Sequence, residues 1–232
     1  MAGSDLHRTL DAVWRIESAR IIGTLARMAR DVGIAEELAQ DALVAALEQW
    51  PHKGVPDNPG AWLTATAKNR ALDLLRHRSM QAGKADALTW EIETQMQDGA
   101  PPAPDAGFDN PVGDDVLRLM FVACHPVLSP EARVALTLKM VGGLATPDIA
   151  RAFLLPEATL AQRIVRAKRT LSEAHVPFEL PDPAELGERL DAVLRVIYLI
   201  FNEGYAATAG EDWTRPALCD EALRLGRVLA TL

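Results

Sequence analysis

The sequence predicts an all-α protein. Apolar residues recur mostly at three- and four-residue spacing, which is the period of one face of a helix. Aromatic residues make up only 5% of the 232 residues, and alternating strand patterns are scarce. Stretches rich in proline and glycine divide the chain into residues 5–80, 81–113, 114–176 and 177–232. We therefore expect a helical bundle, a linker, a second small helical domain and the start of a helical extension.

Residues 5–80 are expected to form the bundle. A helix is predicted from Ala35 to Trp50, where Pro51 would end it. Glycine and proline make the stretch 52–59 a predicted loop. Helix is expected again from Gly60 to about Arg78, with apolar residues along one side.

Residues 81–113 are the candidate linker. Pro101, Pro102 and Pro104 exclude a regular helix around them. Between residues 81 and 116, eight acidic residues stand against one lysine. This acidic and proline-rich composition predicts a mobile segment.

Residues 114–176 are predicted to be helical again. The first helix should stop at His125-Pro126, and Pro130 should open another that runs to about Val141. Two further helices with a short turn between them complete this part. After Pro177 the apolar pattern is again helical, and it is still helical where the sequence ends at Leu232. We expect the natural protein to continue beyond this residue.

The stretch 143–171 has the pattern of a helix-turn-helix. Thr146 is a suitable N-cap, and Pro147 then occupies the first helical position. The small side chain of Ala150 allows a second helix to approach closely. The turn is expected at 154–157, and the second helix should begin near Glu157 or Ala158.

The second helix of this motif has two distinct faces. At 100° per residue, one narrow stripe is apolar and must be buried; it contains Leu160, Ile164, Ala167 and Leu171. The candidate DNA-contacting residues are Ala161, Gln162, Val165, Arg166, Lys168 and Arg169, of which Lys168 flanks the stripe. Guanidinium, amide and small apolar groups are those that read base edges and phosphates in a major groove. The alternative is an ordinary helical hairpin with a solvated basic face.

These residues resemble the extracytoplasmic-function sigma factors of bacteria. Residues 144–171 look like the helix-turn-helix of their domain four, which reads the −35 promoter element, and residues 10–80 look like their domain two. The motif 201–205, Phe-Asn-Glu-Gly-Tyr, resembles a subgroup with a tetratricopeptide-like C-terminal extension. Many relatives carry Lys or Arg where this chain has Ala161, a difference that bears on base preference.

The resemblance implies that domain two reads the −10 element and holds melted single strand. The candidate residues for that contact are Lys53, Asp57, Asn58, Lys68, Asn69, Arg70 and Arg76. Cations clustered near the end of one helix would bind phosphates with a steep dependence on salt, or they would interact with the helix dipole. Asn69 could contact a base edge or could serve as a local cap. The loop residues at 53–58 could surround an extruded base or could simply form a turn. Trp62 could stack a base, although packing in the core is favoured.

The resemblance also implies partners. The helix over 35–47 looks like the one that docks on the clamp helices of the polymerase β′ subunit, and domain four implies a contact with the β flap. The candidate docking residues are Glu36, Glu37, Gln40, Asp41 and Glu48. A run of this kind is usually a solvated face, but opposite a basic coiled coil it would steer docking. An anti-sigma factor, or self-regulation by the extension, is a further possible partner interaction.

The net charge of −8 does not exclude DNA binding, because contact is made by a local surface. Charge is segregated, since residues 130–176 hold seven basic and four acidic residues.

No cofactor, metal site or catalytic residue is expected, because the sequence lacks metal-ligand spacing, Gly-rich phosphate loops and hydrolase motifs. The adjacent Cys124 and His125 are not expected to act as a catalytic dyad. No signal peptide or membrane-spanning run is visible, so a cytoplasmic protein without membrane insertion is expected.

The sequence therefore predicts a sigma factor that brings polymerase to promoters and catalyses no reaction itself. Two alternatives remain open. One is a dimeric helix-turn-helix regulator that binds duplex DNA without polymerase, and the other is a helical-repeat scaffold with an incidental basic face.

Overall fold

The structure, a computed structural model, describes residues 3–81, 111–205 and 216–230. Within these ranges all regular structure is helical, which confirms the predicted fold class. Most of the expected linker, residues 82–110, lies outside the described residues. The first and last parts of the expected linker, residue 81 and residues 111–113, belong to helices rather than to the connection.

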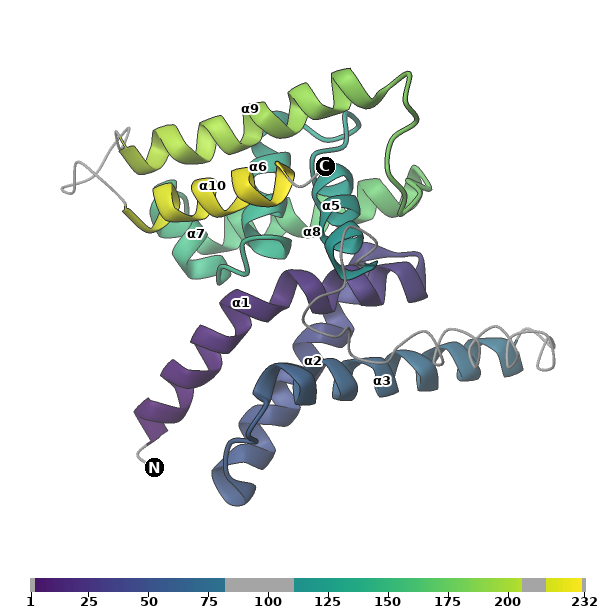
Figure 1. Ribbon diagram of the computed structural model, residues 1–232, viewed down its shortest axis with the longest axis vertical. Helices are drawn as coiled ribbons and strands as arrows, with labels where there is room; N and C mark the ends of the chain where they lie inside the picture. The colour runs from purple at the N-terminus through teal and green to yellow at the C-terminus, as the bar shows by residue number, and fades with distance from the viewer. Residues whose placement is uncertain (1–2, 82–110, 206–215, 231–232) are drawn as a thin grey trace.

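Three helices form the N-terminal bundle: α1 (Gly3–Ala29), α2 (Val32–Lys53) and α3 (Pro59–Gln81). All three contact one another, and the last turns of α3 extend beyond the bundle (Figure 1). Asp31 caps α2, because its Oδ1 accepts hydrogen bonds from the backbone N–H groups of Gly33 and Ile34.

The expected end of α2 at Pro51 is wrong. The helix continues through Pro51 to Lys53, and it begins at Val32 rather than at Ala35. A proline in the last turn removes only one of the final backbone hydrogen bonds, so the helix tolerates it there. Gly54 ends the helix with a φ of 83°, a left-handed value that glycine adopts without steric cost, and its N–H donates to the carbonyl of Trp50.

Four helices follow: α5 (Pro111–Ala123), α6 (Pro130–Met140), α7 (Thr146–Ala152) and α8 (Glu157–Glu173). The ends of α5 and α6 and the start of α8 agree with the sequence prediction. Ser129 caps α6 by accepting from the N–H of Ala132. The expected N-cap Thr146 is instead the first helical residue, and Ala145 occupies the cap without a side-chain hydrogen bond. Pro147 lies in the first turn, where its missing N–H would in any case have no intrahelical partner.

The extension begins with two helices, α9 (Leu186–Tyr205) and α10 (Pro216–Leu229), which pack along each other (Figure 1). Two arginines fasten this pair to the preceding helices. The guanidinium of Arg189 donates to the carbonyl of Phe121 at 3.1 Å, and that of Arg224 donates to the carbonyl of Val141 at 2.5 Å. Within the described residues, no helix is both long and apolar enough to cross a bilayer.

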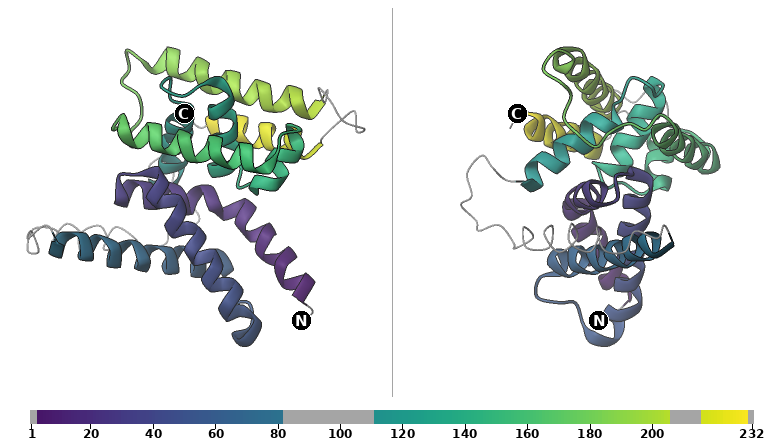
Figure 2. Two further views of the ribbon diagram at one scale, coloured as in Figure 1. Left: turned by 180° about the vertical axis from the view of Figure 1, so that it is seen from behind. Right: turned by 90° about the vertical axis from the view of Figure 1, so that its right-hand side faces the viewer.

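The N-terminal bundle and the helices after the linker share one apolar core. Helix α1 packs against α5, and a Cβ added at Gly23 would come within 2.9 Å of the carbonyl oxygen of Asp115. Helix α8 lies across the end of the α1–α2 pair (Figure 2). The sequence suggested two separate modules, whereas the structure packs them directly against each other.

Candidate nucleic-acid interface

The apolar stripe of α8 is buried, as the helical period predicts. Leu160, Ile164, Ala167 and Leu171 all face inward, and α8 contacts both α6 and α7 along its length. The turn between α7 and α8 places Leu154 at a φ of 50°, and the N–H of Leu155 bonds back to the carbonyl of Ala150. This geometry holds α8 across α7 and fixes which of its faces points outward.

The outward face of α8 carries four of the predicted DNA-contacting side chains. Gln162, Val165, Arg166 and Arg169 are exposed, and Ala161 is half-buried. Val165 is 59% exposed, so its isopropyl group is accessible on this face. The Nε of Arg169 lies 2.6 Å from Oε1 of Glu173 on the same helix, so this guanidinium is partly neutralised. The face presents an amide, an isopropyl group and a guanidinium together, which suits a major groove.

Lys168 lies apart from these residues. Its ammonium Nζ is 2.6 Å from Oε2 of Glu36 in α2, and its side chain is mostly buried. Lys168 was predicted to flank the buried stripe and to contact DNA, whereas in this structure a buried carboxylate from a distant part of the chain neutralises it.

The predicted −10 residues lie on α3 and in the loop before it, except for Lys53, which is the last residue of α2. Lys53, Asp57, Asn58, Asn69 and Arg76 are exposed, whereas Lys68 and Arg70 are half-buried. The Oδ1 of Asn58 accepts from the N–H of Ala61 at 3.0 Å, so Asn58 caps the start of α3. Lys53 donates to Gln49 Oε1 at 3.2 Å. Lys68, Arg70 and Arg76 thus all lie on the single helix α3, and Asp57 lies in the loop that precedes it.

Trp62 packs in the bundle, as favoured from the sequence. Its ring lies edge-on to that of Trp50, with centroids 5.5 Å apart and an interplanar angle of 67°. Trp50 is buried, and Trp62 is partly buried against the same core. This pair fixes the angle between α2 and α3, so it positions the loop that carries Asp57 and Asn58.

The predicted polymerase-docking residues do not all share one solvated face. Glu37, Asp41 and Glu48 are exposed on α2, and Asp41 pairs with Arg70 of α3 at 3.2 Å. Glu36 corrects the expectation, because only 3% of it is exposed. Gln40 is half-buried and donates to Oε1 of Glu36. Glu36 and Gln40 therefore belong to an internal contact in this arrangement.

Sequence reasoning missed two buried ionic groups. Asp115 is fully buried and pairs with Arg27 of α1 and Arg118 of its own helix, at 3.1 and 3.0 Å. Glu221 is buried beside Arg224 at 2.7 Å. Burial raises the pKa of both carboxyl groups, against the opposing attraction of the guanidinium groups. Asp115 was counted with the acidic linker, and no local signal marked its partner in α1.

Cys124 and His125 do not form a dyad. Burial raises the pKa of the Cys124 thiol to about 11, and its sulfur contacts Thr137 Oγ1 at 3.4 Å. The Nδ1 of His125 accepts from the N–H of Val127. In the described part of the chain, no group of three His, Cys, Asp or Glu side chains is placed to hold a metal ion.

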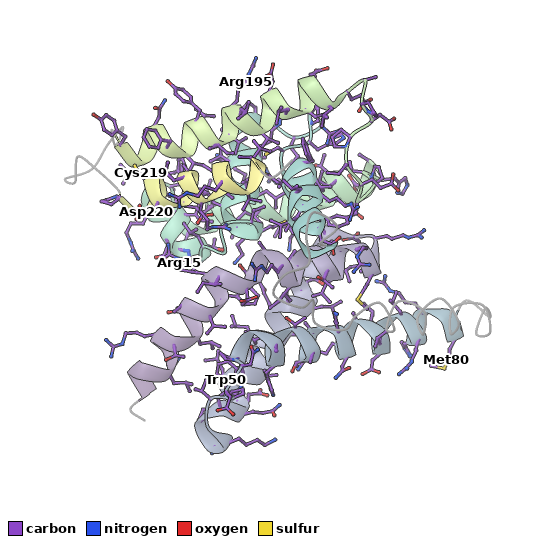
Figure 3. The ribbon with its side chains drawn as sticks, viewed as in Figure 1. Arg15, Trp50, Met80, Arg195, Cys219 and Asp220 are labelled. Atoms are coloured by element: carbon purple, nitrogen blue, oxygen red, sulfur yellow. The ribbon has the colours of Figure 1, made fainter. Side chains whose placement is uncertain are left out.

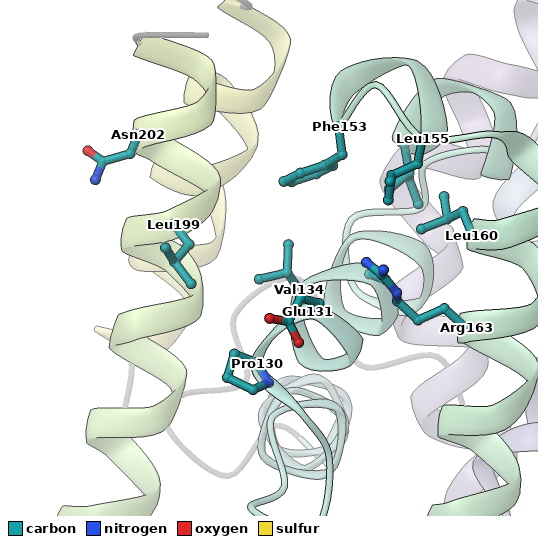
Figure 4. Close-up of a pocket in the computed structure, with 11 residues that line it drawn as sticks. Pro130, Glu131, Val134, Phe153, Leu155, Leu160, Arg163, Leu199 and Asn202 are labelled. Atoms are coloured by element: carbon teal, nitrogen blue, oxygen red, sulfur yellow. The ribbon is translucent and has the colours of Figure 1, made fainter. Parts of the chain in front are cut away.

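A cavity of about 530 Å³ lies between the helix-turn-helix and α9 (Figure 4). Its lining is largely apolar, with Val134, Phe153 and Leu160 on one side and Leu199 on the other. Arg163 and Glu131 lie at its polar edge. From α8 the cavity is lined by Leu160 and Arg163, and its lining includes none of the predicted DNA-contacting residues.

Comparison with protein families finds three matches along the chain. Residues 15–80 match Sigma-70 region 2, and residues 118–171 match Sigma-70, region 4. Residues 189–232 match a family of unknown function, DUF6596. The matched regions correspond to the α1–α3 bundle, to the helices from α5 to α8, and to the α9–α10 pair.

Curated relatives agree with these matches. An uncharacterized protein of Rhizobium meliloti is 41% identical over 91% of this chain and 49% of its own length. The probable ECF RNA polymerase sigma factor SigI of Mycobacterium tuberculosis is 27% identical over 77% of this chain and 59% of its own length. The ECF RNA polymerase sigma factor SigK of Mycobacterium bovis is 29% identical over 66% of this chain and 78% of its own length.

The chain spans only about half the length of the first of these relatives and under two thirds of the second. No solved structure gives a significant match. Region 2 and region 4 occur in the expected order, and each corresponds to a helical unit of the structure. The chain belongs to the extracytoplasmic-function RNA polymerase sigma factors.

Proposed function

We propose that this protein directs core RNA polymerase to specific promoters and starts transcription there, acting in the cytoplasm. The observation that carries the proposal is the exposed face of α8, where Gln162, Val165 and Arg166 lie side by side on a helix whose opposite stripe is buried. The same chain holds a region 2 bundle before it. A helix that binds duplex DNA, joined to a bundle that docks on polymerase, accounts for both the exposed face of α8 and the region 2 bundle.

In this proposal, α8 enters the major groove at the −35 element. Arg166 contacts a guanine edge or a phosphate, Gln162 contacts an adenine or a phosphate, and Val165 contacts a thymine methyl group. Ala161, at the edge of this face, is short and leaves space beside one base pair. Arg169 and Lys168 add phosphate contacts once Glu173 and Glu36 release them.

The bundle supplies the second contact. Exposed Asn69 and the cations of α3 hold the backbone and bases of the opened strand at the −10 element, together with Asp57 and Asn58 in the preceding loop. Glu37, Asp41 and Glu48 form the exposed acidic side of α2. We assign this side to the basic clamp helices of the β′ subunit, and region 4 to the β flap.

The proposal is tested by footprinting promoter DNA with purified core polymerase, with and without the chain. We expect protection at both the −10 and −35 elements only when both proteins are present. Arg166→Ala should weaken protection at −35 by about tenfold or more, because a base-edge or phosphate contact is lost. Arg195→Ala is the matched control, since Arg195 projects from α9 away from the rest of the molecule (Figure 3).

Two outcomes would contradict the proposal. Protection of duplex DNA by the chain alone, unchanged by core enzyme, would indicate a helix-turn-helix regulator that works without polymerase. Absence of any DNA protection, with or without core enzyme, would indicate a helical scaffold.

A further inference from the structure

The cavity between the helix-turn-helix and α9 has a buried apolar floor and one wall from the extension. Ala135 of α6, Ile149 of α7 and Leu160 of α8 line the floor, and all three are buried. Leu199 lines the facing wall from α9 (Figure 4). The cavity is therefore built jointly by region 4 and by the extension.

The size of the cavity suits a small molecule. Its volume of about 530 Å³ lies within the range of about 300–1,000 Å³ that is usual for small-molecule sites. A cavity of about 150 Å³ holds one benzene ring, so this one has room for up to roughly 20 non-hydrogen atoms. Leu199 is 43% exposed and Phe153 is half-buried, so a bound molecule would remove apolar surface of both from water.

Arg163 of α8 places a positive charge at the mouth of the cavity. Its side chain is half-buried, yet it makes no ion pair or hydrogen bond with the described residues. The other half-buried arginines in the described ranges each bond to a carboxylate or a backbone carbonyl: Arg70, Arg118, Arg133, Arg189 and Arg224. A half-buried guanidinium without a partner at the edge of an apolar cavity favours an anionic group there.

Glu131 also lies at the mouth, but its carboxylate already has partners. Its own backbone N–H and the hydroxyl of Ser129, both at the start of α6, hydrogen-bond the carboxylate and hold its pKa below the usual range. The nearby Arg163 guanidinium acts in the same direction with a smaller effect. Glu131 therefore stays ionised and satisfied by its own helix end, while the donors of Arg163 remain available.

We infer that this cavity binds a small carboxylic acid with an apolar body. Arg163 pairs with the carboxylate through the two parallel N–H···O bonds that a guanidinium makes with such a group. Asn202 of α9 lies on the same lining and offers an amide to the polar end. The apolar body fills the space between Phe153 and Leu199, so the bound acid joins the recognition helix to the extension.

Arg163 also borders the candidate DNA surface. It lines a second pocket, of about 330 Å³, together with Gln162 and Arg166. A carboxylate that holds Arg163 on the side of α9 neutralises a cation next to these two residues. The bound acid should therefore weaken binding of duplex promoter DNA. This consequence rests on the proposed function, whereas the binding site itself does not.

Calorimetric titration with decanoate tests the binding site. Decylammonium is the matched probe, because it carries the same alkyl chain with the opposite charge. We expect saturable binding of one decanoate per chain, at least tenfold tighter than binding of decylammonium. Equal affinity for the two probes, or tighter binding of decylammonium, would overturn the assignment of a carboxylate. Absence of saturable decanoate binding would overturn the site.

A charge variant tests the role of Arg163. Arg163→Gln should weaken decanoate binding at least fivefold and remove the preference over decylammonium. Arg151→Gln is the matched control, because Arg151 lies on α7 with its side chain 78% exposed and does not line the cavity. Equal decanoate affinity in the two variants would overturn the role of Arg163.

A filling variant locates the apolar body. Leu199→Trp should place an indole in the cavity and weaken decanoate binding at least tenfold, without loss of helical circular dichroism, because Leu199 is already 43% exposed. Leu194→Trp is the matched control, since Leu194 is 48% exposed on the same helix and lies outside the lining. Unchanged decanoate binding in Leu199→Trp would place the alkyl chain on another apolar surface and overturn the site.

A titration with duplex promoter DNA tests the consequence. The chain with core polymerase is titrated at several salt concentrations, with and without saturating decanoate. We expect decanoate to lower the salt slope by about one in the wild type and to leave the slope of Arg163→Gln unchanged. An equal wild-type slope in both conditions would overturn the link to DNA and leave the site intact. Absence of promoter binding in both conditions would overturn the proposed function, whatever the calorimetric result.

Discussion

The Nε of Arg27 in α1 lies 3.1 Å from Oδ2 of Asp115 in α5, across a separation of 88 residues in the chain. The carboxylate side chain is 1% exposed, whereas the Arg27 side chain is 42% exposed. A buried carboxylate held by a partly solvated guanidinium at a helix crossing makes the relative position of the two regions sensitive to a single side chain.

Removing this carboxylate should destabilise the folded protein. Asp115→Ala leaves the guanidinium groups of Arg27 and Arg118 without their partner and opens a small cavity, so the free energy of unfolding should fall by about 2 kcal/mol. Urea denaturation followed by circular dichroism measures the change. Asp73→Ala is the control, because the Asp73 side chain is 78% exposed and its loss should cost under about 0.5 kcal/mol. If Asp115→Ala lowers the free energy of unfolding as little as Asp73→Ala does, the contact between Asp115 and the two guanidinium groups is contradicted.

Stability should also depend on pH through Asp115. Burial raises the pKa of this carboxyl in the folded state, so the folded protein holds the proton more tightly than the unfolded chain does. The resulting contribution is fully present below the unfolded pKa and is lost as pH rises through the folded pKa. Relative to Asp115→Asn, the wild type should therefore gain stability as pH falls from about 7 toward 4. The opposite slope would show that the guanidinium groups, rather than burial, dominate this site.

The two cysteines should differ in reactivity. The Cys124 thiol is buried, and its pKa of about 11 leaves little thiolate near neutral pH, whereas Cys219 is partly exposed. We expect one thiol per chain to react rapidly with a maleimide in the native state and two in denaturant, with mass spectrometry locating the first at Cys219. Rapid native modification of Cys124 would mean that the core around α5 opens readily.

Arg166 should account for a measurable part of the salt dependence of promoter binding. When the polymerase–sigma complex is titrated with duplex DNA at several salt concentrations, Arg166→Ala should lower the salt slope by about one if Arg166 contacts a phosphate. If Arg166 contacts a guanine instead, the salt slope should stay unchanged, and the discrimination between the correct and a wrong base at one base pair should fall by about 1–3 kcal/mol. No change in either quantity would remove Arg166 from the interface.

Local periodicity was enough to predict the helices and the buried stripe of α8. The apolar repeat within this one helix is enough to predict which side chains are buried: Leu160, Ile164, Ala167 and Leu171. The turn before α8 follows from the sequence 154–157. The same reasoning failed at Pro51 and Thr146, because helix ends tolerate a residue or two of variation at little energetic cost. Trp62 was assigned to packing correctly because an aromatic residue on an apolar helix face gains most from burial.

The contacts between the two regions could not be predicted in this way. Lys168 and Glu36 are separated by 132 residues, and neither position carries a local sign of its partner. Glu36 and exposed Glu37 are adjacent residues of the same type, and in the structure α8 packs against α2 on the side of Glu36. Charge pairs of this kind depend on tertiary geometry that a single sequence does not encode locally.

Run-off transcription with purified core polymerase tests the central claim most directly. On a template carrying a promoter for this protein, we predict transcripts that begin at one position and require both the chain and core enzyme, and that decline with Arg166→Ala but not with Arg195→Ala. Tight, sequence-specific binding of the chain to DNA without any such transcript would contradict the assignment of a sigma factor's role to this chain.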